Sequence, residues 1–386
     1  MAAVGTVRPS VERQGAPWRD FVHTGPDTLA GRYLRTFWHP VYLAKDLAPG
    51  RAKPIHIMGE DFTLYRGETG APHIVAFRCA HRGTQLSTGW VEGDEIRCFY
   101  HGWKYDAGGQ CVEQPAEPEP FCGRIKIRGY PTEQYLGLIF AYLGDSPAPP
   151  LTRYPEFESD DEVFEETLSD LWPCNYFQRI ENIPDLSHVP FTHFQLGRSV
   201  PRVEVRETEY GVDATGYHLN GRIDHVHYQM PNVTRFVVGA RDSAETSDRD
   251  RIKWKVPVDD EHCLDFAVSW VHVSGDGVAK YRERQAERAA QESAFRPIEE
   301  LGEEVLSSKA RVQDMLDHPN ATNIQDYMTM IGQGSIVDRG IEHLGRPDVG
   351  VTLIRRIWER ELRAFAEGRH LKNWTESQVV PPVEGE

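Results

Sequence analysis

The chain has 386 residues, which suggests about two domains, and its 39% hydrophobic residues are ordinary for a folded protein. The formal net charge of −16 argues against nucleic acid as a partner, because phosphate binding draws on clustered Lys and Arg. No run approaches the roughly 18 apolar residues of a membrane helix, and residues 1–15 lack the apolar segment of a signal peptide. We therefore expect a cytoplasmic protein with no membrane partner.

The first third of the sequence predicts an arm followed by a small all-β domain. Residues 1–36 are rich in Gly, Pro and charged residues and are predicted to form the arm. Over residues 37–145, short alternating segments are separated by turn residues, a pattern typical of short antiparallel strands. Residues 135–143 are predicted to be the buried closing strand, and the Gly- and Pro-rich segment 144–150 ends the domain.

Two short motifs in this domain combine Cys with His: Cys79-Ala80-His81 and Cys98-Phe99-Tyr100-His101. Two thiolates can hold one iron of a [2Fe–2S] cluster and two imidazoles the other, which is the Rieske arrangement and raises the reduction potential above that of an all-cysteine cluster. Strand-like residues precede each motif, so two hairpin tips are predicted to clasp one cluster. The alternative is a zinc site, although zinc fingers place a Cys pair before a His pair.

Beyond residue 145 the pattern mixes strands with helices. This mixture predicts an α+β domain over residues 146–377, followed by a loose tail at residues 378–386. Five segments have β-rich composition, and two have the charge pattern or apolar spacing of helices. The predicted strands are 167–175, 203–217, 228–240, 250–257 and 262–273, and the predicted helices are 278–317 and 349–368.

A second candidate metal motif lies in this domain, where His188 and His193 flank Pro190. A regular helix would point two rings five residues apart about 140° from each other, but Pro190 breaks the turn and allows both rings to meet. Two His and one carboxylate leave open positions, as in the facial triad of non-haem Fe(II) oxygenases. Asp185, one turn before His188, is better placed to accept the spare ring N–H of His188 than to bind the metal.

The carboxylate ligand must therefore come from elsewhere in the chain. Asp326 is the first candidate, and Glu181 and Asp314 are weaker alternatives. Taken alone, Asp and His near a proline are often only turn and capping residues. A one-electron cluster in the same chain favours the metal site, because an electron donor implies an acceptor.

Several other residues are candidates for a substrate pocket. His225 and His227 would share one face of a strand, where they either line a pocket or form hydrogen bonds within the sheet. Arg179, Arg235 and Arg251 are candidates for holding a substrate carboxylate through paired hydrogen bonds, although most arginines are simply solvated.

These motifs resemble those of the Rieske non-haem iron aromatic-ring-hydroxylating oxygenases, in particular the terminal oxygenase α subunits of the phthalate-dioxygenase-like branch. The similarity covers nearly the whole chain, with CAH and CFYHGWKYD, then ENIPDLSHVPFTH, then NIQDYMTMIGQGSIVDRGIEHLGRPDVG. Pro184 departs from the pattern of the family, which often has an apolar residue there.

The resemblance implies a fold and a set of metal ligands. The first domain would be an all-β Rieske [2Fe–2S] domain, and the second a helix-grip domain, in which a curved antiparallel sheet surrounds a long helix. Asp185 would pass electrons from the cluster of one subunit to the iron of its neighbour, in a head-to-tail homotrimer or a hexamer of stacked trimers. The implied cluster ligands are Cys79, His81, Cys98 and His101, and the implied ligands of the mononuclear Fe(II) are His188, His193 and Asp326.

The activity that the resemblance implies is hydroxylation or oxidative O-demethylation of a small aromatic substrate, an aromatic acid, with O2 and electrons from NAD(P)H. The sequence has no G-x-G-x-x-G after a predicted strand and no C-x₄-C-x₂-C run, so a separate NAD(P)H-dependent reductase of the flavin and ferredoxin type is expected. Two alternatives stay open: a Rieske electron-transfer protein without oxygenase activity, and a helix-grip binding protein without iron.

Overall fold

A computed structural model describes residues 16–374 except 146, 158–162, 198, 239–248, 273–278, 282, 285, 288–289 and 291–294. Residues 1–15 of the predicted arm and the predicted tail at 378–386 lie outside the described residues. In the rest of the arm, helix α1 (Leu29–Leu34) begins after Thr28, whose hydroxyl accepts the N–H of Gly31 at 3.0 Å. Within the described part of the chain, no helix is long and apolar enough to cross a bilayer.

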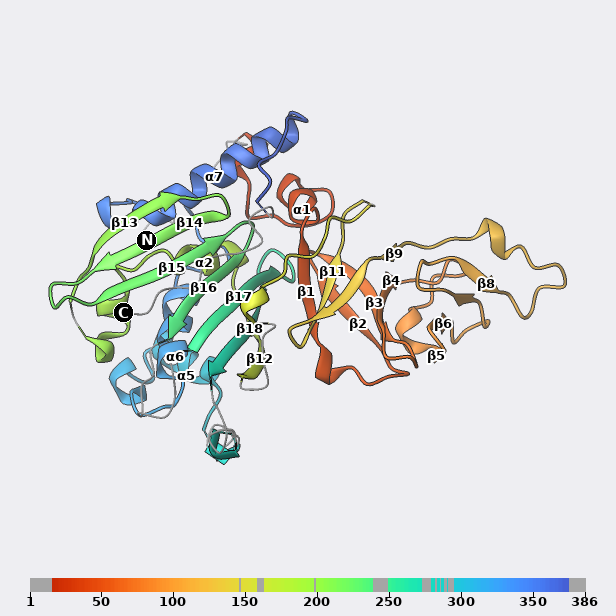
Figure 1. The fold of residues 1–386 in the computed structure, drawn as a ribbon, viewed down its shortest axis with the longest axis horizontal. Helices are drawn as coiled ribbons and strands as arrows, with labels where there is room; N and C mark the ends of the chain where they lie inside the picture. Colours follow the sequence, from red (N-terminus) through yellow and green to blue (C-terminus); the bar gives the residue numbers. More distant parts are fainter. Residues whose placement is uncertain are drawn as a thin grey trace, which may run out of the picture.

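Three small antiparallel sheets form the first domain, at one end of the molecule (Figure 1). Their short strands and tight turns agree with the alternating sequence pattern, and β11 (Leu138–Tyr142) is buried along its whole length, within the predicted closing strand 135–143. The first sheet has the order β1 (Trp38–Leu43), β11, β10 (Thr132–Tyr135); the second β2 (Ala52–Ile57), β3 (Glu60–Arg66), β4 (Pro72–Ala76), β9 (Gly129–Tyr130); the third β5 (Trp90–Glu92), β6 (Glu95–Arg97), β7 (Lys104–Tyr105), β8 (Cys111–Glu113).

A seven-stranded antiparallel sheet dominates the other end of the molecule, and helix α7 (Val349–Ala366) lies across it (Figure 1). Trp358 of α7 is fully buried, and its indole N–H donates to the Tyr228 hydroxyl at 2.8 Å. This is the predicted α+β domain. Its strand order is β12 (Val163–Trp172), β18 (Cys263–His272), β17 (Arg249–Pro257), β16 (Val233–Val238), β15 (Ile223–Gln229), β14 (Gly211–Tyr217), β13 (Arg202–Glu207).

The remaining helices cover this sheet and carry the second metal motif. They are α2 (Tyr176–Asn182), α3 (Val189–Thr192), α5 (Ile298–Leu306) and α6 (Ala321–Ile331). The prediction for α7 is confirmed, whereas α2, α3 and α6 were not predicted as helices. The predicted helix 278–317 is interrupted: α5 is followed by a separate 3₁₀ turn at Val312–Met315, and part of the predicted range lies outside the described residues.

Two of the predicted strands are wrong in extent. The predicted strand 203–217 is a hairpin of β13 and β14, because the chain turns where the Gly211 N–H bonds the Thr208 side chain at 3.0 Å. The predicted strand 228–240 contains the end of β15, a turn and then β16, and most of β15 was missed.

The two ends of the molecule are joined through a shared apolar core. Trp254 of β17 packs edge-on against Phe140 of β11, with ring centroids 5.6 Å apart, and against Tyr154 at 6.1 Å. All three rings are buried. This contact fixes the small sheets against one side of the large sheet.

Candidate metal centres

The two Cys–His motifs form matching loops, each after a short strand. The Cys79 carbonyl accepts the N–H of Gly83 at 2.9 Å, and the Cys98 carbonyl accepts the N–H of Gly102 at 3.1 Å. Both glycines have positive φ, +73° and +74°, which closes each loop in a conformation that other residues adopt at a cost. The predicted pair of tips is therefore present, and each tip presents one Cys and one His.

The four side chains of these loops are arranged as a pair of thiols and a pair of imidazoles. Cys79 and Cys98 are buried, and the rings of His81 and His101 lie 4.5 Å apart. Burial raises the pKa of the Cys79 thiol, whose Sγ lies 3.2 Å from the Tyr105 hydroxyl. The Nδ1 atom of His81 is buried and has no hydrogen-bond partner among the described residues, as expected for a nitrogen that faces a metal.

The zinc alternative requires these four ligand atoms to converge on one point. Among the described residues, only one group of three or more His, Cys, Asp and Glu has ligand atoms within 4.8 Å of one another, and it is not this one. A single Zn²⁺ with bonds of about 2.0–2.3 Å needs closer approach. The loops thus fit two separate metal atoms, one on the thiols and one on the imidazoles.

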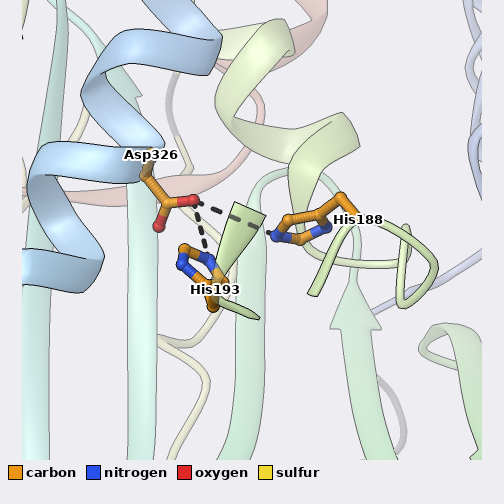
Figure 2. Close-up of side chains that lie close together, drawn as sticks. All are labelled: His188, His193 and Asp326. Carbon is orange, nitrogen blue, oxygen red and sulfur yellow. Dashed lines mark ion pairs between the residues drawn. The ribbon is translucent and has the colours of Figure 1, made fainter. Parts of the chain in front are cut away.

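The convergent group consists of His188, His193 and Asp326, as predicted (Figure 2). Asp326 Oδ1 lies 3.2 Å from His193 Nε2 and 3.9 Å from His188 Nε2. The two histidines flank the single turn of α3, which contains Pro190, and His193 leaves the helical conformation with φ −107° and ψ 48°. The break in the helix therefore brings both rings to one carboxylate of α6.

A hydrogen bond that the sequence did not predict orients one of these rings. The Nδ1 of His193 lies 2.8 Å from Gln325 Oε1, so this nitrogen donates and Nε2 is left as a lone pair that faces Asp326. Gln325 in turn donates to Gln195 Oε1 at 3.0 Å. Adjacency to Asp326 was the only sequence signal for Gln325, and a residue next to a ligand on a helix ordinarily points elsewhere.

Asp185 contacts His188 through its backbone rather than through its carboxylate. The His188 Nδ1 bonds the Asp185 carbonyl oxygen, and the carboxylate Oδ2 lies 3.9 Å from the same nitrogen. The other carboxylate oxygen accepts the N–H of Ser187 at 3.1 Å. Burial raises the pKa of the Asp185 carboxyl. The side chain is thus beside His188 but is left available for another partner.

The donor set fits a ferrous ion. Asp326 Oδ1 is buried and has no hydrogen-bond partner among the described residues, although it faces two imidazole nitrogens. Burial opposes ionisation of Asp326, but His193, Arg179 and His188 together hold its pKa below the usual range. Two neutral imidazoles and one carboxylate with open positions suit Fe(II).

The weaker candidates for the third ligand are engaged elsewhere. Glu181 is ion-paired with Arg339 at 2.9 Å and with Arg355 of α7. Asp314 forms a surface pair with Arg311 at 2.8 Å. Neither acid belongs to the convergent group.

Three of the candidate pocket residues, His225, His227 and Arg235, lie on the face of the large sheet that the described helices do not cover. His227 pairs with Arg235 across β15 and β16, and the register places both on the face opposite Asp265 of β18. Asp265 accepts a hydrogen bond from Arg179 of α2 at 2.8 Å. The face of the sheet that carries Asp265 is therefore the face that α2 covers, and we call it the helix side. His225 shares the face of His227 and contacts Thr215 at 3.2 Å.

Known proteins are similar to this chain in the first domain and over most of its length. A family model of the Rieske [2Fe-2S] domain matches residues 37–133. The chain is 30% identical to the 5,5'-dehydrodivanillate O-demethylase oxygenase subunit of Sphingobium sp., over 90% of this chain and 80% of that protein. It is 32% identical to the phenoxybenzoate dioxygenase subunit alpha of Ectopseudomonas oleovorans, over 88% of this chain and 83% of that protein.

Solved structures agree on the fold. The reduced complex between oxygenase and ferredoxin in carbazole 1,9a-dioxygenase contains a chain that superposes with a TM-score of 0.61 at 20% identity, covering 92% of this chain and 96% of that one.

Proposed function

Because the chain belongs to the Rieske non-haem iron aromatic-ring-hydroxylating oxygenases, as a terminal oxygenase α subunit, we propose that its two candidate centres hold the two metal groups of that family. The protein is an oxygenase with a [2Fe–2S] Rieske cluster and a mononuclear iron. The relatives that match both halves of the chain are oxygenase subunits, which argues against the alternative of an electron carrier alone. The proposed cluster ligands are Cys79, His81, Cys98 and His101, and the proposed iron ligands are His188, His193 and Asp326.

The observation that carries this proposal is the convergence of His188, His193 and Asp326 within 4.8 Å. When bound, the ferrous ion and the cluster supply the electrons that reduce dioxygen next to the substrate. Gln325 fixes the His193 ring so that Nε2 faces the metal position, and the Asp185 carbonyl does the same for His188. The three ligands leave open positions for dioxygen.

Electrons are proposed to cross between subunits. The cluster loops follow β4 and β6, at the far end of the molecule from α6 and the large sheet (Figure 1). A head-to-tail ring, a trimer or stacked trimers, would bring the cluster of one subunit to the iron of the next. Asp185, whose carboxylate Oδ2 lies 3.9 Å from His188 Nδ1, is the proposed bridge.

The proposed partners follow from the same assignment. An electron-transfer protein delivers electrons to the cluster, and we propose that an NAD(P)H-dependent reductase with flavin and ferredoxin groups feeds it in the cytoplasm. The proposed substrate is a small aromatic compound that is hydroxylated or O-demethylated, as the names of the relatives suggest. We further propose that residues 37–145 form the Rieske domain and residues 146–377 the catalytic domain.

The test uses the purified holoprotein with a surrogate reductase and NADH. Oxygen uptake is followed against a panel of aromatic acids and methoxy-aromatics, with analysis of formaldehyde and of cis-diols. Formaldehyde identifies O-demethylation, and a cis-diol identifies dioxygenation. Zinc in place of iron, or the absence of acid-labile sulfide in anaerobically prepared protein, would contradict the proposal.

A further inference from the structure

Lys253, on the helix side of the large sheet, forms no hydrogen bond or ion pair with any residue that the structure describes. The register places Lys253 of β17 directly between Thr234 of β16 and Ala267 of β18. Two positions along β17, Lys255 pairs with Asp265, so alternation puts Lys253 on the same face as Asp265. Lys253 therefore lies on the face that α2 covers.

The same face supports the layer that contains the iron ligands. Trp172 of β12 pairs with Cys263 and so points to the helix side, where its ring centroid lies 6.2 Å from that of Tyr327. Tyr327 follows Asp326 in α6. The charge of Arg179 acts on both Asp326 and Lys253, which places the two near one buried cation. Lys253 thus lies on the same side of the sheet as the candidate iron site.

The cations around Lys253 have partners of their own. Arg179 and Lys255 share Asp265, at 2.8 Å and 2.6 Å. Arg251, two residues before Lys253, donates to the Ser269 hydroxyl at 2.8 Å. The Lys253 ammonium, in contrast, makes no hydrogen bond or ion pair within the part of the chain that the structure describes, although Lys253 is only partly exposed.

The electrostatic surroundings of Lys253 are positive. Burial, together with the charges of Lys255, Arg251 and Arg179, lowers the pKa of Lys253 to about 7, although Asp265 partly opposes this shift. Asp170 of β12 is the other nearby carboxyl group; burial raises its pKa, and the charge of Lys253 opposes that shift. A partly buried ammonium that forms no ion pair carries a desolvation cost, which a bound anion would reduce.

We propose that Lys253 anchors the anionic group of the substrate and that this group is the carboxylate of an aromatic acid. The inference rests on the proposed function, since it places the aromatic ring between the sheet and the iron ligands. An ammonium on a flexible stem is a compact charge that suits one carboxylate oxygen. With Lys253 as the anchor, the protein would bind aromatic acids in preference to neutral aryl ethers.

The test measures binding to the metal-loaded holoprotein without reductase, so that no turnover occurs. The probes are benzoate and nitrobenzene, which have similar shapes but differ in charge. We compare Lys253→Gln and Lys253→Arg with Lys309→Gln, which changes an exposed lysine. Lys253→Gln should weaken benzoate binding by about 10- to 100-fold, with nitrobenzene unchanged, because charge-assisted hydrogen bonds are the strong ones. Lys253→Arg should retain most of the affinity, and Lys309→Gln all of it.

The pH dependence gives a second measurement that needs no variant. The wild-type affinity for benzoate should fall as the pH rises above about 7, because the free protein then loses the ammonium that receives the carboxylate. Benzoate affinity that is equal in Lys253→Gln and wild type, or independent of pH in wild type, would overturn the inference even if oxygenation is observed. Benzoate binding that depends on Lys253 without oxygen uptake on any substrate would instead support the anchor and contradict the proposed function.

Discussion

His193 Nε2 and Asp326 Oδ1 lie 3.2 Å apart, although His193 follows α3 and Asp326 belongs to α6. Their approach is made by the packing of two helices on one sheet, not by a local motif. The third member, His188, reaches the same carboxylate oxygen at 3.9 Å because the helix between the two histidines is only one turn long. The candidate iron site therefore forms only in the folded domain.

Removal of the carboxylate should empty the iron site without disturbing the cluster. Asp326→Ala leaves two imidazoles, which hold Fe(II) less well than a facial triad. We expect the mononuclear iron to be lost, oxygenase turnover to fall more than about 100-fold, and the visible absorption of the cluster to be retained. Asp314→Ala, which removes an exposed ion-paired acid, is the control and should change none of these. Full iron content in Asp326→Ala would refute the assignment.

Substitution of Asp185 should separate electron transfer from metal binding. The backbone carbonyl of Asp185, not the carboxylate, bonds His188, so Asp185→Asn should leave the orientation of His188 intact. We expect both metals to be present and turnover to fall by about 10- to 100-fold. Reduction of the cluster and its reoxidation by O2 with substrate, followed by stopped-flow absorbance, should show a slowed reoxidation step. Normal turnover in this variant would remove the proposed bridge.

The sequence predicted that His188 and His193 converge, on the reasoning that Pro190 breaks the helix between them. In the structure Pro190 lies in the first turn of α3, where proline is tolerated, and the helix instead ends at His193. Asp326 was ranked ahead of Glu181 and Asp314 from the sequence, and the family resemblance implied the same ligand. What disqualifies Glu181 is its pairing with Arg355, a contact of tertiary structure.

Strand register is the other information that the linear pattern lacks. Alternation shows that His225 and His227 share a face, but not which face of the sheet is covered by helices. The sequence did not predict that Lys253 is partly buried, because a strand lysine is ordinarily exposed and the packing of α2 on β17 belongs to the tertiary structure. The interruption after α5 likewise depends on packing, since charged Ala- and Glu-rich segments favour a continuous helix.

The contact between α7 and the iron motif predicts that Gly350 does not tolerate a larger side chain. A methyl group at Gly350 would lie 2.8 Å from the Pro184 carbonyl oxygen, just before Asp185. Gly350→Ala should therefore displace this segment, lower the free energy of unfolding by about 1–3 kcal/mol and reduce iron retention. Gly123→Ala, where the added methyl meets no atom within 4 Å, is the matched control. The two measurements are urea unfolding and iron content after gel filtration, and equal values for the two variants would contradict the packing argument.

His39 should make the junction between the two domains sensitive to acid. It is fully buried, its Nε2–H donates to the Leu34 carbonyl at 2.8 Å, and its Nδ1 accepts from Asn232 at 3.4 Å. Burial lowers its pKa from 6.5 to about 4, so between these values the unfolded chain binds a proton that the folded chain does not. The free energy of unfolding should fall by about 3 kcal/mol as the pH drops from 6.5 to 4, and this part of the dependence should disappear in His39→Gln. Urea unfolding at several pH values measures it, with His262→Gln, which changes an exposed histidine, as control. An identical pH profile for His39→Gln and wild type would show that His39 carries its proton in the folded state.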